Sequence, residues 1–265
     1  MSERLTRILI SFDCDSIAPD VLEMLAVLGD GQNMELTGLF VEDEDLLRAA
    51  RLPGLREVSL TGEVRNLSVD QISRQLSQQA TQAKARFEAS VRKLNYTGNF
   101  RIVRGHALEP VAAAARGSDL VVITRSLRSS GLRARLGLAF ETIVSEHSNV
   151  LFVNEPWASG SSVIALCESP EGGCARALAT ARRFAEREDL DLVIALPAGT
   201  GADPQVNSRE RVVRLSDWGE TGIVALCERE DARLLVLSPS KQLDWRNLLV
   251  RLMDRLSCSL LRLED

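Results

Sequence analysis

The chain has 265 residues, of which 45% are apolar and 26% charged, and its formal net charge is -5. This composition is ordinary for a soluble globular protein and excludes a disordered chain. The negative charge excludes a typical nucleic-acid-binding protein, whose affinity comes largely from phosphate contacts. No stretch approaches the roughly 18 successive apolar residues of a membrane span.

The first residues, MSERLTRILISFD, contain no apolar region of signal-peptide length. We therefore expect a cytoplasmic protein. The five cysteines form no C-x-x-C pair, and they are Cys14, Cys167, Cys174, Cys227 and Cys258. In a reducing compartment they are expected to be free thiols.

In the first half of the chain, short apolar runs alternate with helical patterns. Strands are expected at 7–13, 35–41, 100–105, 119–124 and 149–155. Helices are expected at 21–28, 68–94 and 107–116 and near 140–146. The acidic stretch 42–66 is interpreted as irregular. Strands that alternate with helices indicate βαβ units and a parallel sheet.

The segment PWASGSS at 156–162 is interpreted as a linker, and after it the pattern begins again. Strands are expected at 162–168, 190–197, 211–215, 232–238 and 258–264. Helices are expected at 175–184 and 245–256. The sequence therefore predicts two domains, residues 1–155 and 156–265.

The two halves are interpreted as a tandem repeat in which the second copy is shorter. Pairing the first strands gives an offset of 155 residues, and pairing the fourth strands gives an offset of 114. The second half therefore lacks about 41 residues (155 − 114), and the loss falls between LDLVIALP and RVVRL. The first half has its acidic stretch and its long helix at that place.

The chain resembles the universal stress protein family in its tandem two-domain form. The resemblance rests on Asp13 at the end of the first strand, on ELTGLFVEDED, on Gly105 after the third strand, and on the loop after the fourth strand. It implies an α/β fold with two tandem doubly wound domains. Each has a five-stranded parallel sheet of the adenine nucleotide alpha hydrolase-like type, and the second is truncated. The domains are expected to form an intramolecular pseudo-dimer through their fifth strands, and a homodimer of the whole chain stays open.

Members of this family that bind nucleotides carry G-x2-G-x9-G-[ST] after the fourth strand, where small residues let backbone N–H groups approach phosphate. Thr124, Leu127, Gly137 and Leu138 occupy these positions here, so one of the four is kept. The resemblance implies that Asp13 and Val41 could still hold adenosine. The alternative is that Asp13 caps a turn and that Val41 is a core residue.

Other chemistry has weaker support. Arg125, Arg128, Arg133 and Arg135 could bind an anion or form a solvated basic face. No P-loop, no G-x-S-x-G elbow and no zinc-ligand spacing occurs, so no catalytic or metal residue is predicted.

The candidate binding positions are therefore Asp13, Val41, Gly105, Thr124, Arg125 and Gly137. The expected function is that of a non-catalytic stress-response or signalling protein that acts through protein partners. No cofactor is assigned, and ATP binding is expected to be weak or lost. Neither nucleic acid nor membrane is expected as a partner. The alternative is an adenine-nucleotide-binding switch with a nucleotide or anion in the first-domain cleft.

Overall fold

The computed structural model describes residues 5–12, 19–28, 34–52, 56–58, 64–66, 69–105, 109–125, 143, 149–154, 159–168, 174–201, 204–238 and 245–264. In the first half, the main strands are β1 (Arg7–Phe12), β2 (Glu35–Asp43), β5 (Thr97–Gly105), β6 (Leu120–Arg125) and β7 (Val150–Asn154). The helices between them are α1 (Pro19–Leu28), α3 (Val69–Lys93) and α4 (Glu109–Ala115).

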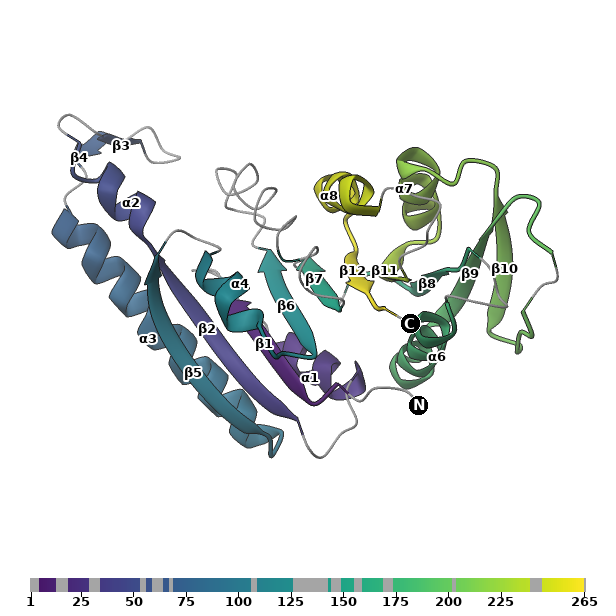
Figure 1. Cartoon of the computed structure of the whole chain (residues 1–265), viewed down its shortest axis with the longest axis horizontal. Helices are drawn as coiled ribbons and strands as arrows, with labels where there is room; N and C mark the ends of the chain where they lie inside the picture. Colours follow the sequence, from purple (N-terminus) through teal and green to yellow (C-terminus); the bar gives the residue numbers. More distant parts are fainter. Residues whose placement is uncertain are drawn as a thin grey trace.

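The second half repeats this alternation (Figure 1). Its strands are β8 (Ser162–Leu166), β9 (Asp191–Pro197), β10 (Glu210–Leu215), β11 (Ala232–Leu237) and β12 (Ser259–Arg262). Its helices are α6 (Ala175–Glu188), α7 (Glu220–Arg229) and α8 (Trp245–Arg255).

All ten of these strands form one sheet in the order β10-β9-β8-β11-β12-β7-β6-β1-β2-β5. Within each half, the third strand is followed across the sheet by the second, first, fourth and fifth. Every neighbouring pair within a half is parallel. The α/β fold with two doubly wound groups of five strands is therefore confirmed.

The two halves meet at their fifth strands, β7 and β12, which pair antiparallel. Leu151 lies opposite Leu261 at the centre of this ladder. On the two sides of that centre, the Asn154 backbone N–H donates to Ser259 Oγ at 3.1 Å, and the Glu264 backbone N–H donates to Asn149 Oδ1 at 3.0 Å. The two bonds are related by a local two-fold axis, as in the interface of a symmetric dimer.

Helices cover both faces of the sheet and create two hydrophobic cores that continue across the junction. On one face, α1, α3 and α6 pack on alternate residues of strands from both halves. On the other face, α4, α7 and α8 pack on the remaining residues of those strands. Because β-strand side chains alternate between faces, one apolar strand supplies both cores.

The second half is shortened at the place that the sequence predicts. In the first half, α2 (Glu44–Ala49), β3 (Arg56–Val58), β4 (Val64–Asn66) and α3 connect β2 to β5. In the second half, residues 198–209 connect β9 to β10, and the described part of this connection contains no helix. Arg214 holds it by donating to the carbonyl oxygens of Thr200 and Gly201, at 2.7 and 3.0 Å.

Two expectations about local structure are wrong, and a third is not tested. The stretch 42–66 is not irregular throughout, because it contains α2 and the antiparallel pair β3–β4. Leu47 of α2 is buried against Ile72 and Leu76 of α3, so tertiary packing stabilises a helix too short to form alone. Helix α7 was not expected, although its buried residues Ile223, Val224, Leu226 and Cys227 follow helical spacing. The expected helix near 140–146 lies outside the described residues except for Ile143.

The expectation of free thiols is wrong for two of the cysteines. Cys167 and Cys174 form a disulfide, with their Cα atoms 5.4 Å apart. Cys167 follows β8 and Cys174 precedes α6, and the packing of these two elements brings the side chains within bonding distance. Cys227 and Cys258 are free and buried, as expected, and Cys14 lies outside the described residues.

Strand β8 begins at Ser162, as the sequence predicts. Gly160 before it has a φ of +106°, and a Cβ there would lie 2.6 Å from the Arg233 backbone nitrogen. Only glycine tolerates both conditions. The domain boundary at 155/156 stays a prediction, since residues 155–158 lie outside the described part of the chain.

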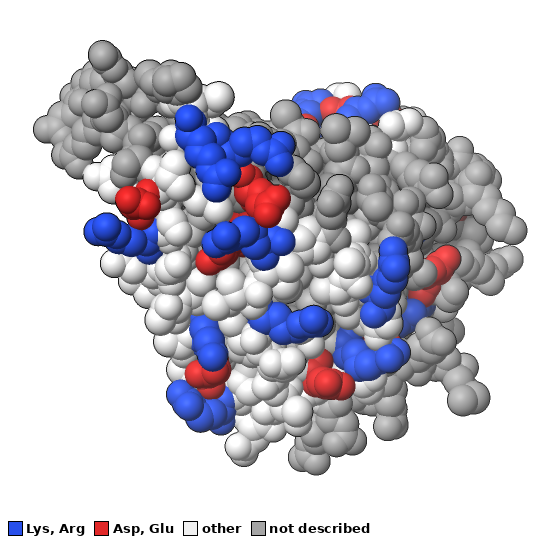
Figure 2. Space-filling model, turned by 60° about the vertical axis from the view of Figure 1, so that its left-hand side comes forward, with Lys and Arg blue, Asp and Glu red and all other residues white. Residues whose placement is uncertain are grey.

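Strand β5 forms one edge of the sheet and carries the exposed side chains Arg101, Ile102 and Arg104. Arg104 pairs with Glu42 at 2.9 Å. Figure 2 brings this side of the molecule forward and shows basic and acidic side chains next to one another on the described surface. Charges on an edge strand disfavour pairing with the edge of another sheet.

Candidate functional site

The candidate site lies at the carboxyl ends of the strands in the first half. Ligands of doubly wound sheets bind beyond this edge, where successive connections leave on opposite sides of the sheet. Here that point lies between β1 and β6, which are neighbours in the sheet although β2 and β5 separate them in the chain. The second half has its own equivalent between β8 and β11.

Four of the predicted site residues lie on described strands that meet at this edge. Val41 is near the end of β2, Gly105 ends β5, and Thr124 and Arg125 end β6. In the strand order β6-β1-β2-β5, β2 and β5 are neighbours, and β1 lies between β2 and β6. Asp13 and Gly137 lie outside the described residues, so their predicted roles stay predictions.

Thr124 fills the position at which the family pattern has its first glycine. Its side chain is buried, with an exposed fraction of 5%. Its hydroxyl donates to the Ser11 carbonyl oxygen of β1 at 3.1 Å. The hydroxyl thus ties β6 to β1 across the point where the strand order reverses.

Gly105 and Val41 have local structural reasons for their identities. A Cβ at Gly105 would lie 2.8 Å from Pro110 Cγ at the start of α4, so glycine allows α4 to approach β5 closely. Val41 is half-buried and packs against the core on the α4 face. Arg125 pairs through its backbone with Asn154 of β7.

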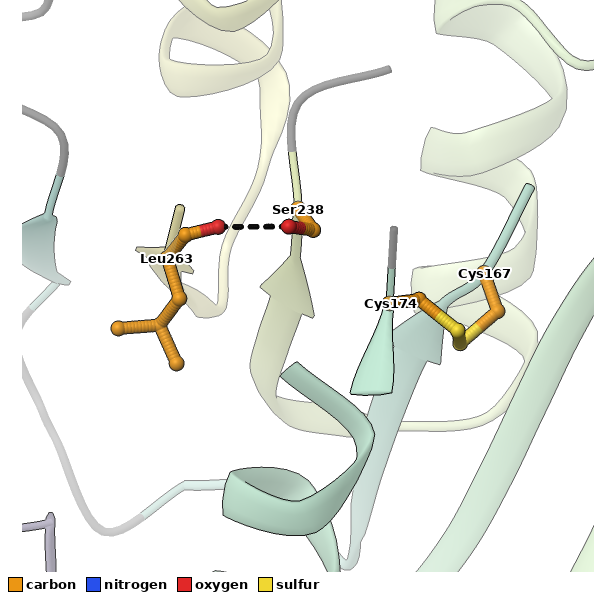
Figure 3. The surroundings of a disulfide bond; sticks show 4 residues. All are labelled: Cys167, Cys174, Ser238 and Leu263. Atoms are coloured by element: carbon orange, nitrogen blue, oxygen red, sulfur yellow. Dashed lines mark hydrogen bonds between the residues drawn. A yellow bond between two sulfur atoms is a disulfide. The ribbon is translucent and has the colours of Figure 1, made fainter. Parts of the chain in front are cut away.

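The second half has a hydroxyl at the position equivalent to Thr124. Ser238 follows β11, is buried, and donates through Oγ to the Leu263 carbonyl oxygen at 2.8 Å (Figure 3). The register supports this equivalence, because Ile8 pairs with Leu120 as Val163 pairs with Leu234. The Ser238 bond reaches the residue directly after the fifth strand of its half, whereas the Thr124 bond reaches the first strand.

The second carboxyl edge also carries the disulfide (Figure 3). Cys167 directly follows β8, and its backbone N–H donates to the Ala195 carbonyl oxygen of β9 at 2.9 Å. Cys174 is the N-cap residue of α6 and makes no side-chain capping bond. This pair was not predicted from the sequence, although Cys167 ends an apolar strand run and Cys174 precedes a helical pattern.

The other two described cysteines form a thiol pair without a covalent bond. Cys227 lies on α7, and Cys258 precedes β12. A hydrogen bond between the two thiols, together with burial, raises the pKa of Cys227 well above its usual value. Cys227 is therefore protonated near neutral pH and is a poor nucleophile.

A groove of about 610 Å³ lies in the second half at the amino ends of the strands, between α6 and the start of β10. Arg182 of α6 makes two hydrogen bonds to the Glu210 carboxylate there, both at 3.0 Å. Arg209 and Asp189 form a further ion pair. The groove lies beside α6, β9 and β10, which correspond to the elements that α3 contacts in the first half. It is therefore a consequence of the shortened connection.

No helix in the described part is both long and apolar enough to cross a membrane. Among the same residues, no group of three His, Cys, Asp or Glu side chains is arranged to hold a metal ion.

Neither a protein-family model nor a curated protein matches the sequence. Solved structures do match over nearly the whole chain. A universal stress protein from Archaeoglobus fulgidus DSM 4304 superposes with a TM-score of 0.63 at 13% identity, covering 98% of this chain and 97% of that one. A candidate universal stress protein from Pseudomonas aeruginosa UCBPP-PA14 gives 0.58 at 14% identity, covering 98% and 93%.

A third match is the cytoplasmic domain of a prokaryotic cation chloride cotransporter, with a TM-score of 0.51 at 12% identity, covering 98% of this chain and 95% of that one. The same architecture therefore occurs in proteins with different roles, and function must be argued from the site. At these identities the comparisons establish the architecture: the chain has the α/β fold of the universal stress proteins.

Proposed function

We propose that the chain is a non-catalytic protein of the universal stress type that acts in stress response or signalling through protein partners. The fold shared with universal stress proteins supports this role. We further propose that ATP binding is weak or lost.

The observation that carries the proposal is the Thr124 side chain. A glycine at this position would leave the backbone between β6 and β1 open to a phosphate. Thr124 instead places a branched side chain there, and its hydroxyl is occupied by the Ser11 carbonyl oxygen at 3.1 Å. Ser238 gives the second half a similarly occupied hydroxyl.

Thermal unfolding with and without ATP and Mg²⁺ tests the loss of binding. A ligand that binds only the native state stabilises it by about 2.7 kcal/mol at 100 times its dissociation constant. We expect the midpoint to stay unchanged at millimolar ATP. A midpoint that rises with ATP, and falls back in Asp13→Ala, would contradict the proposal.

The alternative function is an adenine-nucleotide-binding switch in the first half. The half-buried position of Val41 near the carboxyl end of β2 favours it, because that side chain keeps some surface for a ligand. The ATP experiment separates the two functions. The variant Thr124→Gly sharpens it, since only a cleft that otherwise fits ATP would gain affinity from a smaller side chain.

The remaining parts of the proposal are the location and the assembly. We propose that the protein is located in the cytoplasm. For the assembly there are two alternatives, a monomer and a homodimer of the whole chain. Fractionation of cells that express the protein tests the location. Light scattering of the purified chain at several concentrations tests the assembly.

A further inference from the structure

The disulfide between Cys167 and Cys174 joins the sheet to a helix that also contacts the other half of the molecule. Cys167 directly follows β8, and Cys174 directly precedes the first residue of α6. The bond therefore attaches the amino end of α6 to the carboxyl end of its own strand. The Cys174 carbonyl oxygen accepts from the Leu178 N–H at 2.8 Å, so this residue also begins the helix.

Helix α6 carries the main contact between helices of the two halves. Arg183 Nη2 donates to the Leu28 carbonyl oxygen at 3.3 Å, and Arg187 Nη1 donates to the Ala26 carbonyl oxygen at 3.1 Å. Both acceptors are in the last turn of α1, which has no basic residue of its own there. The arginines thus satisfy carbonyl groups that the end of a helix leaves without partners.

The same face of α6 is packed as core. Ala181 and Phe184 are fully buried in the cluster that also contains residues of α1 from the first half. A change that loosens α6 on β8 therefore acts on the contact with α1 as well. The covalent bond lies at one end of α6, and the arginine contacts lie further along the helix.

We propose that Cys167 and Cys174 form a redox modification site whose disulfide fixes α6 on the sheet and thereby stabilises the contact between the two halves. The reaction partner is a dithiol reductant. The reductant supplies two electrons and two protons and closes its own disulfide. In return the Cys167–Cys174 bond opens to two thiols. The reverse exchange with an oxidised dithiol restores the bond.

The burial of the pair determines how this exchange proceeds. The exposed fractions are 1% for Cys167 and 2% for Cys174. An attacking thiolate must reach a sulfur atom, so exchange requires the start of α6 to open first. The site responds to sustained changes of redox conditions, and its reduction is faster in mild denaturant.

Peptide mapping establishes the redox state. The protein is alkylated in denaturant, either directly or after treatment with dithiothreitol, and the peptides that contain Cys167 and Cys174 are weighed. We expect both to be alkylated only after reduction. Alkylation of both cysteines without the reductant, in protein purified under air, would overturn the proposal.

Hydrogen exchange then tests the effect on α6. On reduction, amide exchange in α6 and in the last turn of α1 should rise at least about tenfold, because a closed loop of this length contributes more than a tenfold change to an opening equilibrium. The melting temperature should fall by about 5 °C. Exchange in α6 that does not change on reduction would refute the role of the bond.

The second thiol pair provides a matched control. The double variant Cys227→Ala/Cys258→Ala removes two buried sulfur atoms but no covalent bond, and it should keep the full response to reductant. The double variant Cys167→Ala/Cys174→Ala should lose that response. If this variant does not fold, titration of the unmodified chain with dithiothreitol compares the chain with and without the disulfide.

Discussion

Asn154 offers the sharpest test of how the two halves are held together. It ends β7 and is buried, with an exposed fraction of 9%. Its side-chain amide donates to the carbonyl oxygens of Leu256 and Cys258, at 3.1 and 2.7 Å. Both acceptors belong to the segment that leads into β12, so one side chain of the first half satisfies two backbone groups of the second.

The variant Asn154→Ala removes both donors and leaves two buried carbonyl groups without them. Each lost partner of this kind costs about 1–3 kcal/mol. We expect the free energy of unfolding to fall by about 2–6 kcal/mol in total. The variant Asn154→Asp keeps the size of the side chain but places a carboxylate oxygen, in the position of Nδ2, against the two carbonyl oxygens. It should therefore be destabilised more than Asn154→Ala at neutral pH.

Urea unfolding followed by circular dichroism measures these differences. Asn99→Ala is the matched control, because Asn99 is an exposed residue on the edge strand β5, and its replacement should change the free energy by less than about 0.5 kcal/mol. If Asn154→Ala is no less stable than Asn99→Ala, the junction does not depend on the Asn154 amide and the reasoning is refuted.

Three further substitutions test other parts of the structure by the same urea assay. Burial alone would raise the pKa of Asp119, but hydrogen bonds from the backbone and side chains of Arg7 and Thr6 hold it below its usual value. Its stabilising effect is therefore full above about pH 4 and is lost as the pH falls through the folded pKa. Asp119→Asn should lower the free energy of unfolding at pH 7. It should also reduce the loss of that free energy between neutral and acid pH, and an unchanged dependence on pH would contradict this. Gly160→Ala should cost about 2 kcal/mol or more because of its positive φ and the close Arg233 nitrogen, so a stable variant would argue against that geometry. Thr124→Val should cost about 1 kcal/mol through the lost bond to Ser11, and a neutral result would remove the structural role assigned to its hydroxyl.

The strands and the long helix could be predicted because their signals are local. A buried parallel strand is a short apolar run, as at Val121–Ile123, and any such run is visible in the sequence. The spacing of Ile72, Leu76, Ala80, Ala83, Phe87 and Val91 similarly predicts α3. Helix α2 was missed because its stability comes from contact with α3, which the residues of α2 do not show by themselves.

The candidate site could be predicted only in part. The sequence placed Val41, Gly105 and Thr124 at the ends of strands, and the structure brings those strands together at one edge. It did not show that the Thr124 hydroxyl bonds to Ser11, since the two residues are far apart in the chain. The groove beside Arg182 could not be predicted either, because it depends on how α6, β9 and β10 pack where the second half has no described equivalent of α3.

The sequence by itself determined the α/β class, the repeat and the place where the second copy is shortened. These features depend on the period and spacing of apolar residues, which the chain carries locally. Only the tertiary structure decided that Cys167 bonds to Cys174, that Asn149 and Asn154 bracket the junction, and that α6 donates to α1. Each of these depends on the distance between particular atoms, and such distances are set by how the elements pack.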